Sequence, residues 1–105
     1  MNPKFWGMLS LAMRAGKLAV GEDKATEATR GGKACLLILS QDAGNNTEKK
    51  VTDMAAFRNI PILRPADRVR IGQAIGKEFA VALAVTDAGF AEQLSLLFSQ
   101  ETENE

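Results

Sequence analysis

The chain has 105 residues, of which 46% are hydrophobic and 25% charged, so it has the size and composition of one globular domain. Its 13 Lys and Arg balance its 13 Asp and Glu, and it holds no histidine and a single cysteine. This inventory excludes an internal disulfide, the common zinc sites and every catalytic arrangement that needs a histidine. We therefore expect no metal, no cofactor and no enzyme activity.

The single cysteine, Cys35, lies inside an apolar run and is expected to be a small core residue in a reducing compartment. The longest apolar runs are well short of the roughly 20 residues that cross a bilayer, so we expect a cytoplasmic protein. No glycine pattern of a nucleotide-binding loop is present. Gly72 and Gly76 form a G-x-x-x-G, which indicates close helix packing rather than nucleotide binding.

Apolar residues at helical spacing over residues 3–15 predict a first helix, with Trp6 packed in the core rather than stacked on a base. Leu18–Val20 then suits a short strand. Gly21 follows the strand and opens a second helix, which ends near Gly31. The inward positions of this second helix are alanines, so it is expected to lie close to the sheet.

Residues 34–40 and 79–85 are continuous apolar runs, which predict two strands buried on both faces. Thr47 is expected to cap the helix that follows the first of these runs. A further strand is expected over Ile60–Leu63, and Pro61 favours an edge position or a strand start for it.

Asp67 is expected to cap the next helix, and either Thr86 or Asp87 to cap the last one. Helices and strands thus alternate along the chain, and this pattern predicts helices on both faces of a mostly parallel sheet. We expect a single domain over residues 1–99, followed by an acidic flexible tail over residues 100–105.

Basic residues collect in two segments of the chain. Residues 1–35 hold six Lys and Arg against three carboxylates, and residues 61–80 hold four against two. The helix start at Gly21 has free N–H groups that favour a phosphate or a carboxylate, and the arginines of the second segment suit phosphates or unstacked bases. The alternative is that these are solvated charges around ordinary turns. The residues alone favour neither reading.

Two segments carry motifs in a distinctive order: VGEDKATEATRGGKACLLILSQDAGNNTEKKV, residues 20–51, and RPADRVRIGQAIGKEFAVALAVTDAGFA, residues 64–91. The first resembles the strand–turn–helix–strand core of the kink-turn RNA-binding ribosomal proteins of archaea and eukaryotes. The second resembles their second signature loop and last strand, with Ile71-Gly72 as the apolar-glycine pair. VTDAGFAEQL and AGNNTEKKVTD are most similar to a bacterial, ribosomal-protein-like branch, the YlxQ-type proteins.

The resemblance implies an α/β fold, a three-layer α-β-α sandwich with a mixed sheet of about four strands. It also implies a non-catalytic RNA-binding protein that recognises kink-turn-like structured RNA, either ribosomal or another non-coding RNA, with the ribosome as a further candidate partner. We expect it to act as a monomer. The alternative is a protein–protein interaction module on the same fold, with weak or no RNA affinity.

In this family the helix-opening segment reads sheared G·A pairs, and a second loop covers an extruded base. Carried over, Gly21 permits close approach to RNA, and the next three residues contact bases and phosphates. The candidate RNA-binding residues are Gly21, Glu22, Asp23, Lys24, Glu27, Arg30, Lys33, Arg64, Pro65, Ala66, Arg68 and Arg70. The chain departs from the family at Glu27, where a lysine is usual, and at Asp23 and Lys24, which replace an Asn-Glu pair.

Overall fold

The computed structural model describes residues 3–103, with side chains described as far as residue 100. Five helices alternate with four strands in this part of the chain. In order they are α1 (Pro3–Arg14), β1 (Leu18–Val20), α2 (Glu22–Arg30), β2 (Leu36–Leu39), α3 (Asn45–Arg58), β3 (Ile62–Leu63), α4 (Arg68–Ala74), β4 (Ala82–Val85) and α5 (Ala88–Glu103).

The four strands form one mixed sheet in the order β1-β4-β2-β3. Strand β4 is antiparallel to both of its neighbours, whereas β2 and β3 are parallel. The mixed sheet implied by the family resemblance is therefore confirmed, and the mostly parallel sheet expected from the alternation of elements is wrong for β4. The cause is the connection through α4, which stays at the end of the sheet where β3 finishes. There the N–H of Ala80 donates to the carbonyl of Arg68 at 3.0 Å. The chain thus stays at that end, and β4 runs back from it.

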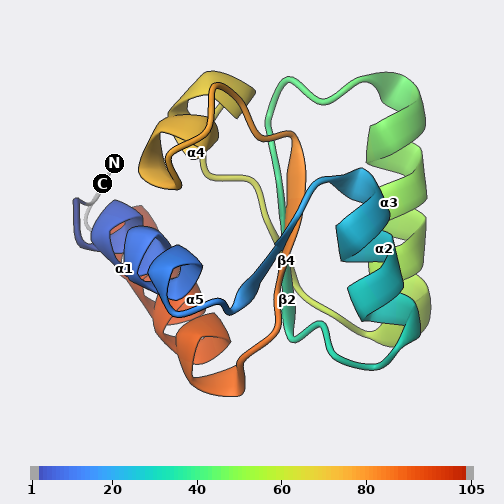
Figure 1. Ribbon diagram of the computed structural model, residues 1–105, viewed down its shortest axis with the longest axis horizontal. Helices are drawn as coiled ribbons and strands as arrows, with labels where there is room; N and C mark the ends of the chain where they lie inside the picture. Colours follow the sequence, from blue (N-terminus) through green and yellow to red (C-terminus); the bar gives the residue numbers. More distant parts are fainter. Residues whose placement is uncertain (1–2, 104–105) are drawn as a thin grey trace.

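Helices cover both faces of the sheet, which gives the three layers seen in Figure 1. Helices α1, α4 and α5 lie on one face, and α2 and α3 on the other. Alternate strand residues point to opposite layers, as the pleat requires. Leu36, Ile38, Leu83 and Val85 face the first layer, and Leu37, Leu39, Ala82 and Ala84 face the second.

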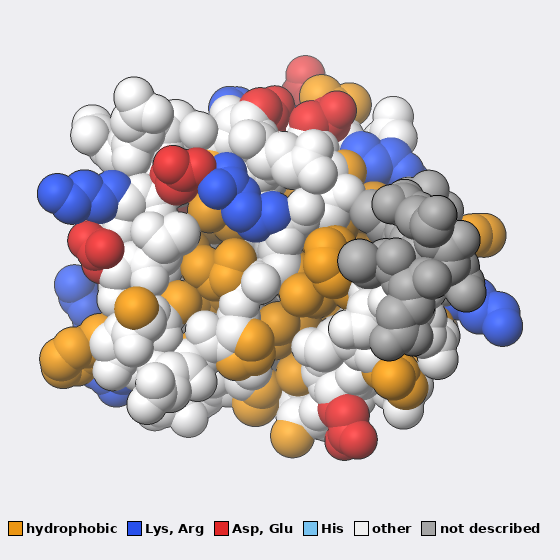
Figure 2. All heavy atoms as spheres, turned by 180° about the vertical axis from the view of Figure 1, so that it is seen from behind, with side chains coloured by type: hydrophobic (Ala, Val, Ile, Leu, Met, Phe, Trp, Pro, Cys, Tyr) orange, Lys and Arg blue, Asp and Glu red, His pale blue; other side chains and the backbone are white. Residues whose placement is uncertain are grey.

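The second layer is built from small side chains. Ala25 and Ala28 of α2 are buried in one cluster with Ala82 and Ala84 of β4. Because alanines meet on both sides, α2 lies close to the strands, as its sequence predicts. Seen from behind, hydrophobic side chains form a band across the middle of the face, between the two helical layers (Figure 2).

Several local predictions are confirmed. Trp6 is only 6% exposed and packs in the core, and Asp67 caps α4 by accepting from the N–H of Arg70 at 2.8 Å. Of the two candidate caps of α5 it is Asp87 that accepts from the Phe90 N–H, at 2.9 Å. Strand β3 lies at the edge of the sheet.

Other local predictions are wrong. Helix α3 begins at Asn45 after Gly44, so Thr47 lies inside its first turn instead of capping it. Cys35 is half-buried and packs at the border of the core. The apolar run 79–85 is not buried throughout, because Phe79 is 54% exposed.

The backbone of α5 continues to Glu103, into the segment predicted as a flexible tail. The last part of that tail, residues 104–105, lies outside the described residues.

Candidate RNA interface

The start of α2 leaves its first N–H groups uncapped. Gly21 is the N-cap, with φ 103° and ψ 155°, and no side chain caps this helix end. These dihedrals lie in a region that essentially only glycine occupies. The Gly21 N–H donates to the carbonyl of Ala82 at 2.9 Å, which fixes the helix start beside the beginning of β4. The first N–H groups of α2 therefore form a fixed donor set with partial positive charge.

Four segments that are distant in sequence meet at this end of the sheet. Besides the Gly21 bond, the Ser40 N–H donates to Val81 at 2.8 Å, and the Gln41 N–H donates to Ala66 at 2.8 Å. The start of α2, the start of β4, the end of β2 and the loop before α4 are thereby tied together. We call this place the sheet end. The two segments predicted to contact RNA, residues 21–24 and 64–68, do converge there.

Arg64 is an internal anchor of the sheet end. Its Nη1 donates to the Glu48 carboxylate at 2.6 Å, and its Nη2 donates to the carbonyl of Ser40 at 3.0 Å. These bonds connect the end of β3 to α3 and to the end of β2. Its guanidinium is thus already hydrogen-bonded within the protein.

Arg68 and Arg70 also have internal partners. The Arg68 side chain donates to the Asp42 carboxylate at 3.3 Å and to the Asp42 carbonyl at 2.7 Å. The guanidinium of Arg70 stacks on the ring of Trp6, 4.1 Å from its centroid. Both arginines thus have partners within the protein and are not simply solvated charges, while their contact with RNA stays a prediction.

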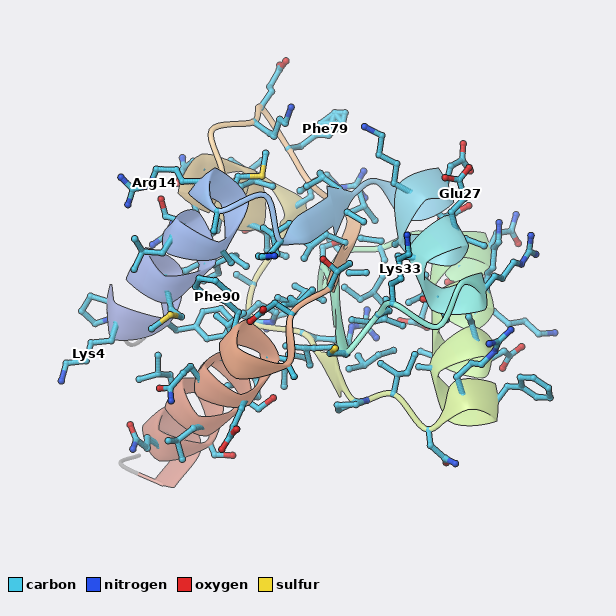
Figure 3. The ribbon with its side chains drawn as sticks, turned by 60° about the horizontal axis from the view of Figure 1, so that its bottom comes forward. Lys4, Arg14, Glu27, Lys33, Phe79 and Phe90 are labelled. Atoms are coloured by element: carbon cyan, nitrogen blue, oxygen red, sulfur yellow. The ribbon has the colours of Figure 1, made fainter. Side chains whose placement is uncertain are left out.

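The rest of the predicted capping loop is largely enclosed. Pro65 is buried and Ala66 half-buried. Two large apolar side chains are exposed beside this loop. One is Val69 of α4, which is 52% exposed, and the other is Phe79, which precedes β4 and follows the exposed residues Lys77 and Glu78 (Figure 3). Sequence reasoning missed Phe79 because it continues an apolar run that was assigned to a strand. The signal was the turn-forming stretch Gly76–Glu78 directly before it.

Glu22 is held by α3 rather than free. The Thr47 hydroxyl and then the Lys50 ammonium lower the pKa of the Glu22 carboxyl by hydrogen bonding to it, and Lys50 Nζ lies 3.3 Å from Glu22 Oε2. The carboxyl therefore links the start of α2 to α3. Asp23 and Lys24 are exposed, and within the described side chains neither forms an ion pair.

The remaining basic candidates lie elsewhere. Arg30 and Lys33 are exposed at the other end of α2, a nine-residue helix about 13 Å long. Glu27 is exposed between the two ends. The structure thus divides the predicted set into residues at the sheet end and residues along α2.

Within residues 3–103, no helix is long and apolar enough to cross a membrane. The same described residues contain no group of three His, Cys, Asp or Glu side chains that could hold a metal ion.

Comparison with known sequences places the chain among bacterial and archaeal relatives. It is 42% identical over 91 residues to the RNA-binding protein YlxQ of Bacillus subtilis (strain 168), an alignment that covers 87% of this chain and 91% of the relative. It is 37% identical over 90 residues to the RNA-binding protein YlxQ of Enterococcus faecium, with 86% of each chain covered. Large ribosomal subunit protein eL30 of Methanosarcina mazei is 29% identical over 86 residues, with 80% of each chain covered.

Solved structures agree with this placement. A protein of unknown function from Bacillus halodurans C superposes with a TM-score of 0.89 at 39% identity, covering 93% of this chain and 99% of that one. The Giardia lamblia 15.5kD RNA binding protein superposes with a TM-score of 0.75 at 15% identity, covering 94% of this chain and 92% of that one, and supports the fold alone.

The sequence also matches the ribosomal protein L7Ae/L30e/S12e/Gadd45 family over residues 4–95. The resemblance read from the sequence is thus confirmed, and the chain belongs to the ribosomal protein L7Ae/L30e/S12e/Gadd45 family.

Proposed function

We propose that this protein binds structured RNA at the sheet end, without catalysing a reaction. The observation that carries the proposal is the uncapped start of α2 at Gly21, set among three other segments at one exposed end of the sheet. Fixed N–H groups at a helix start are suited to phosphate and to base carbonyl oxygens. Two relatives that cover most of the chain are named RNA-binding proteins, which supports the same function.

Three exposed side chains at the sheet end have complementary chemistry for RNA. Lys24 can neutralise a phosphate, and the Asp23 carboxylate can accept a hydrogen bond from the amino group of guanine. Phe79 offers a ring on which an unstacked base can lie, a contact worth about 1–3 kcal/mol in other proteins. Arg64, Arg68 and Glu22 would position the surrounding loops through their internal bonds.

We further propose that the RNA contains a kink-turn-like element. Sheared G·A pairs present guanine edges in a widened groove, where a helix start can approach closely, and an extruded base next to the kink would meet Phe79. Such elements occur in ribosomal and other non-coding RNA, and we expect this protein to act on one as a cytoplasmic monomer.

The test is RNA binding by Lys24→Glu and by Phe79→Ala. Both side chains are exposed, so the substitutions should leave the fold intact. We expect each variant to weaken binding of a fluorescent kink-turn RNA, and Lys24→Glu to reduce the salt slope by about 1. Arg58→Glu, at the far end of α3, is the matched control and should bind normally. Unchanged affinity in both variants would remove the sheet end from the proposal.

A second candidate function is a protein–protein module on the same fold. It is favoured by Glu27, an exposed carboxylate at the position where lysine is usual, and by the internal pairing of Arg64 and Arg68. The salt dependence of RNA binding separates the two functions, because phosphate contacts make log affinity fall linearly with log salt. RNA affinity that is weak and independent of salt would favour the protein partner.

A further inference from the structure

The two edges of the sheet differ in how well they are protected. At the β3 edge the paired strand has only two residues, Pro61 precedes it, and Arg64 follows it with its bonds to neighbouring segments. Short strands and prolines are ordinary devices that stop a sheet edge from pairing with another chain. The β1 edge, three residues long, is also short, but it has neither a proline nor an anchoring side chain across it.

The register of β1 shows which of its backbone groups are unpaired. The Gly21 N–H donates to Ala82, and the Thr86 N–H donates to Lys17, both at 2.9 Å. Residues 17, 19 and 21 therefore exchange hydrogen bonds with β4, because such pairs alternate along an antiparallel ladder. It follows that the N–H and C=O groups of Leu18 and Val20 point away from β4, toward the free edge.

A hollow of about 470 Å³ lies along this free edge, between β1 and α2. Leu18 and Ala19 line its strand side, while Lys24 and Glu27 line its helix side. Lys33 lines it beyond the end of α2, and Figure 3 shows this side chain beside α2, toward the strands. The exposed charges of the hollow are thus two cations with one carboxylate between them.

We propose that an extended peptide segment of a protein partner adds to β1 as a further strand and lies in this hollow. The unpaired backbone groups of Leu18 and Val20 select this class of partner, since an extended backbone offers the matching donors and acceptors. The charges add side-chain selectivity. Every second side chain of an added strand faces α2, and the excess of cations from Lys24 and Lys33 favours acidic residues at those positions.

This proposal does not rest on the proposed RNA function, although the two sites share Lys24. The peptide site depends on the edge of β1, whereas the RNA site depends on Gly21, the exposed start of α2 and Phe79. A substitution that removes the Leu18 N–H should therefore weaken peptide binding and leave RNA binding at the sheet end unchanged.

The experiment uses the full chain and a fluorescent heptapeptide of alternating glutamate and valine, blocked at both ends, with a lysine–valine peptide for comparison. We expect the glutamate peptide to bind and the lysine peptide to bind about tenfold more weakly. Leu18→Pro removes one outward N–H and leaves the hydrogen bonds between β1 and β4 in place. It should weaken the binding of the glutamate peptide about fivefold or more. Leu18→Ala keeps the N–H and is the matched control. Kink-turn RNA should bind wild type and Leu18→Pro equally.

A second measurement needs no protein variant. Glutamate peptides are N-methylated at one residue at a time, and binding should be lost at every second position, whose N–H faces β1. Equal effects at all positions, or no binding of the glutamate peptide, would overturn the proposal even if Leu18→Pro fails to fold. The proposal also falls if RNA, and not the peptide, protects the amides of Leu18 and Val20 from hydrogen exchange.

Discussion

Gly72 lies directly against the backbone of Phe79. A Cβ added to Gly72 would stand 2.6 Å from the Phe79 Cα and 2.8 Å from its nitrogen, which is closer than a real Cβ approaches such atoms. The absence of a side chain in α4 thus lets the chain cross the helix and present Phe79 outward at the sheet end. The close packing predicted from the G-x-x-x-G is confirmed at Gly72.

Gly72→Ala should destabilise the protein, because the new methyl group meets backbone atoms that cannot rotate away. We expect a loss of about 1–3 kcal/mol in the free energy of unfolding, measured by denaturant titration. Gly7→Ala in α1 is the control: its Cβ would meet nothing within 4 Å, and the helix should become more stable by roughly 0.5–1 kcal/mol. Equal stability of Gly72→Ala and wild type would contradict this, because it would show that the backbone at Phe79 can move away from α4 without cost.

Gly21→Ala should destabilise the fold through backbone strain, since space is available around Gly21 but its φ of 103° with ψ of 155° suits glycine. A cost of about 1–3 kcal/mol is expected. Gly16, with φ 73°, lies in the left-handed region that asparagine tolerates, so Gly16→Asn is the milder comparison. Thermal unfolding of the two variants should rank Gly21→Ala lower, and the reverse order would contradict the strain argument.

The Glu22 carboxyl should contribute stability that depends on pH. Hydrogen bonds from Thr47 and Lys50 lower its pKa in the folded protein below the ordinary value of 4.5. This contribution is present above that value and disappears as the pH falls through the folded pKa. Because the pair is partly exposed, we expect Glu22→Gln to cost less than about 1 kcal/mol at neutral pH.

Urea titrations of wild type and Glu22→Gln at a series of acidic pH values measure this pH-dependent contribution of Glu22 to stability. The two unfolding free energies should converge as the medium becomes strongly acidic. A constant difference at every pH would mean that the charge of Glu22 does not stabilise the fold.

Arg64→Ala should lower stability by about 1–3 kcal/mol, because it leaves the Ser40 carbonyl and the Glu48 carboxylate without their donor. Arg68→Ala removes contacts that are more exposed and should cost less. Chemical denaturation of the two variants measures this order. If Arg68→Ala were the more damaging change, Arg64 would not be the main anchor of the sheet end.

The sequence predicts the order of the elements and the buried faces well, because periodicity and capping are local properties. Asp67 and the alanines of α2 are examples. Strand direction is not local: β4 runs opposite to its neighbours because the chain re-enters the sheet at the end where β3 finishes, beside the hydrogen bond between Ala80 and Arg68, and no periodicity reveals this.

The candidate site was predictable only in part. The meeting of residues 21–24 with residues 64–68 follows from the family resemblance. The internal partners of the arginines do not, since Asp42 is 26 residues from Arg68 and Glu48 is 16 residues from Arg64. Phe79 was hidden in an apolar run, where exposure cannot be read from residue type.

The central claim is that the sheet end recognises kinked RNA. The most direct measurement is a titration of the protein with a fluorescent kink-turn RNA, beside the same RNA in which the G·A pairs are replaced by Watson–Crick pairs. Our account predicts tight, salt-dependent binding to the first RNA and much weaker binding to the second. Equal affinity for both RNAs, or no binding to either, would contradict it.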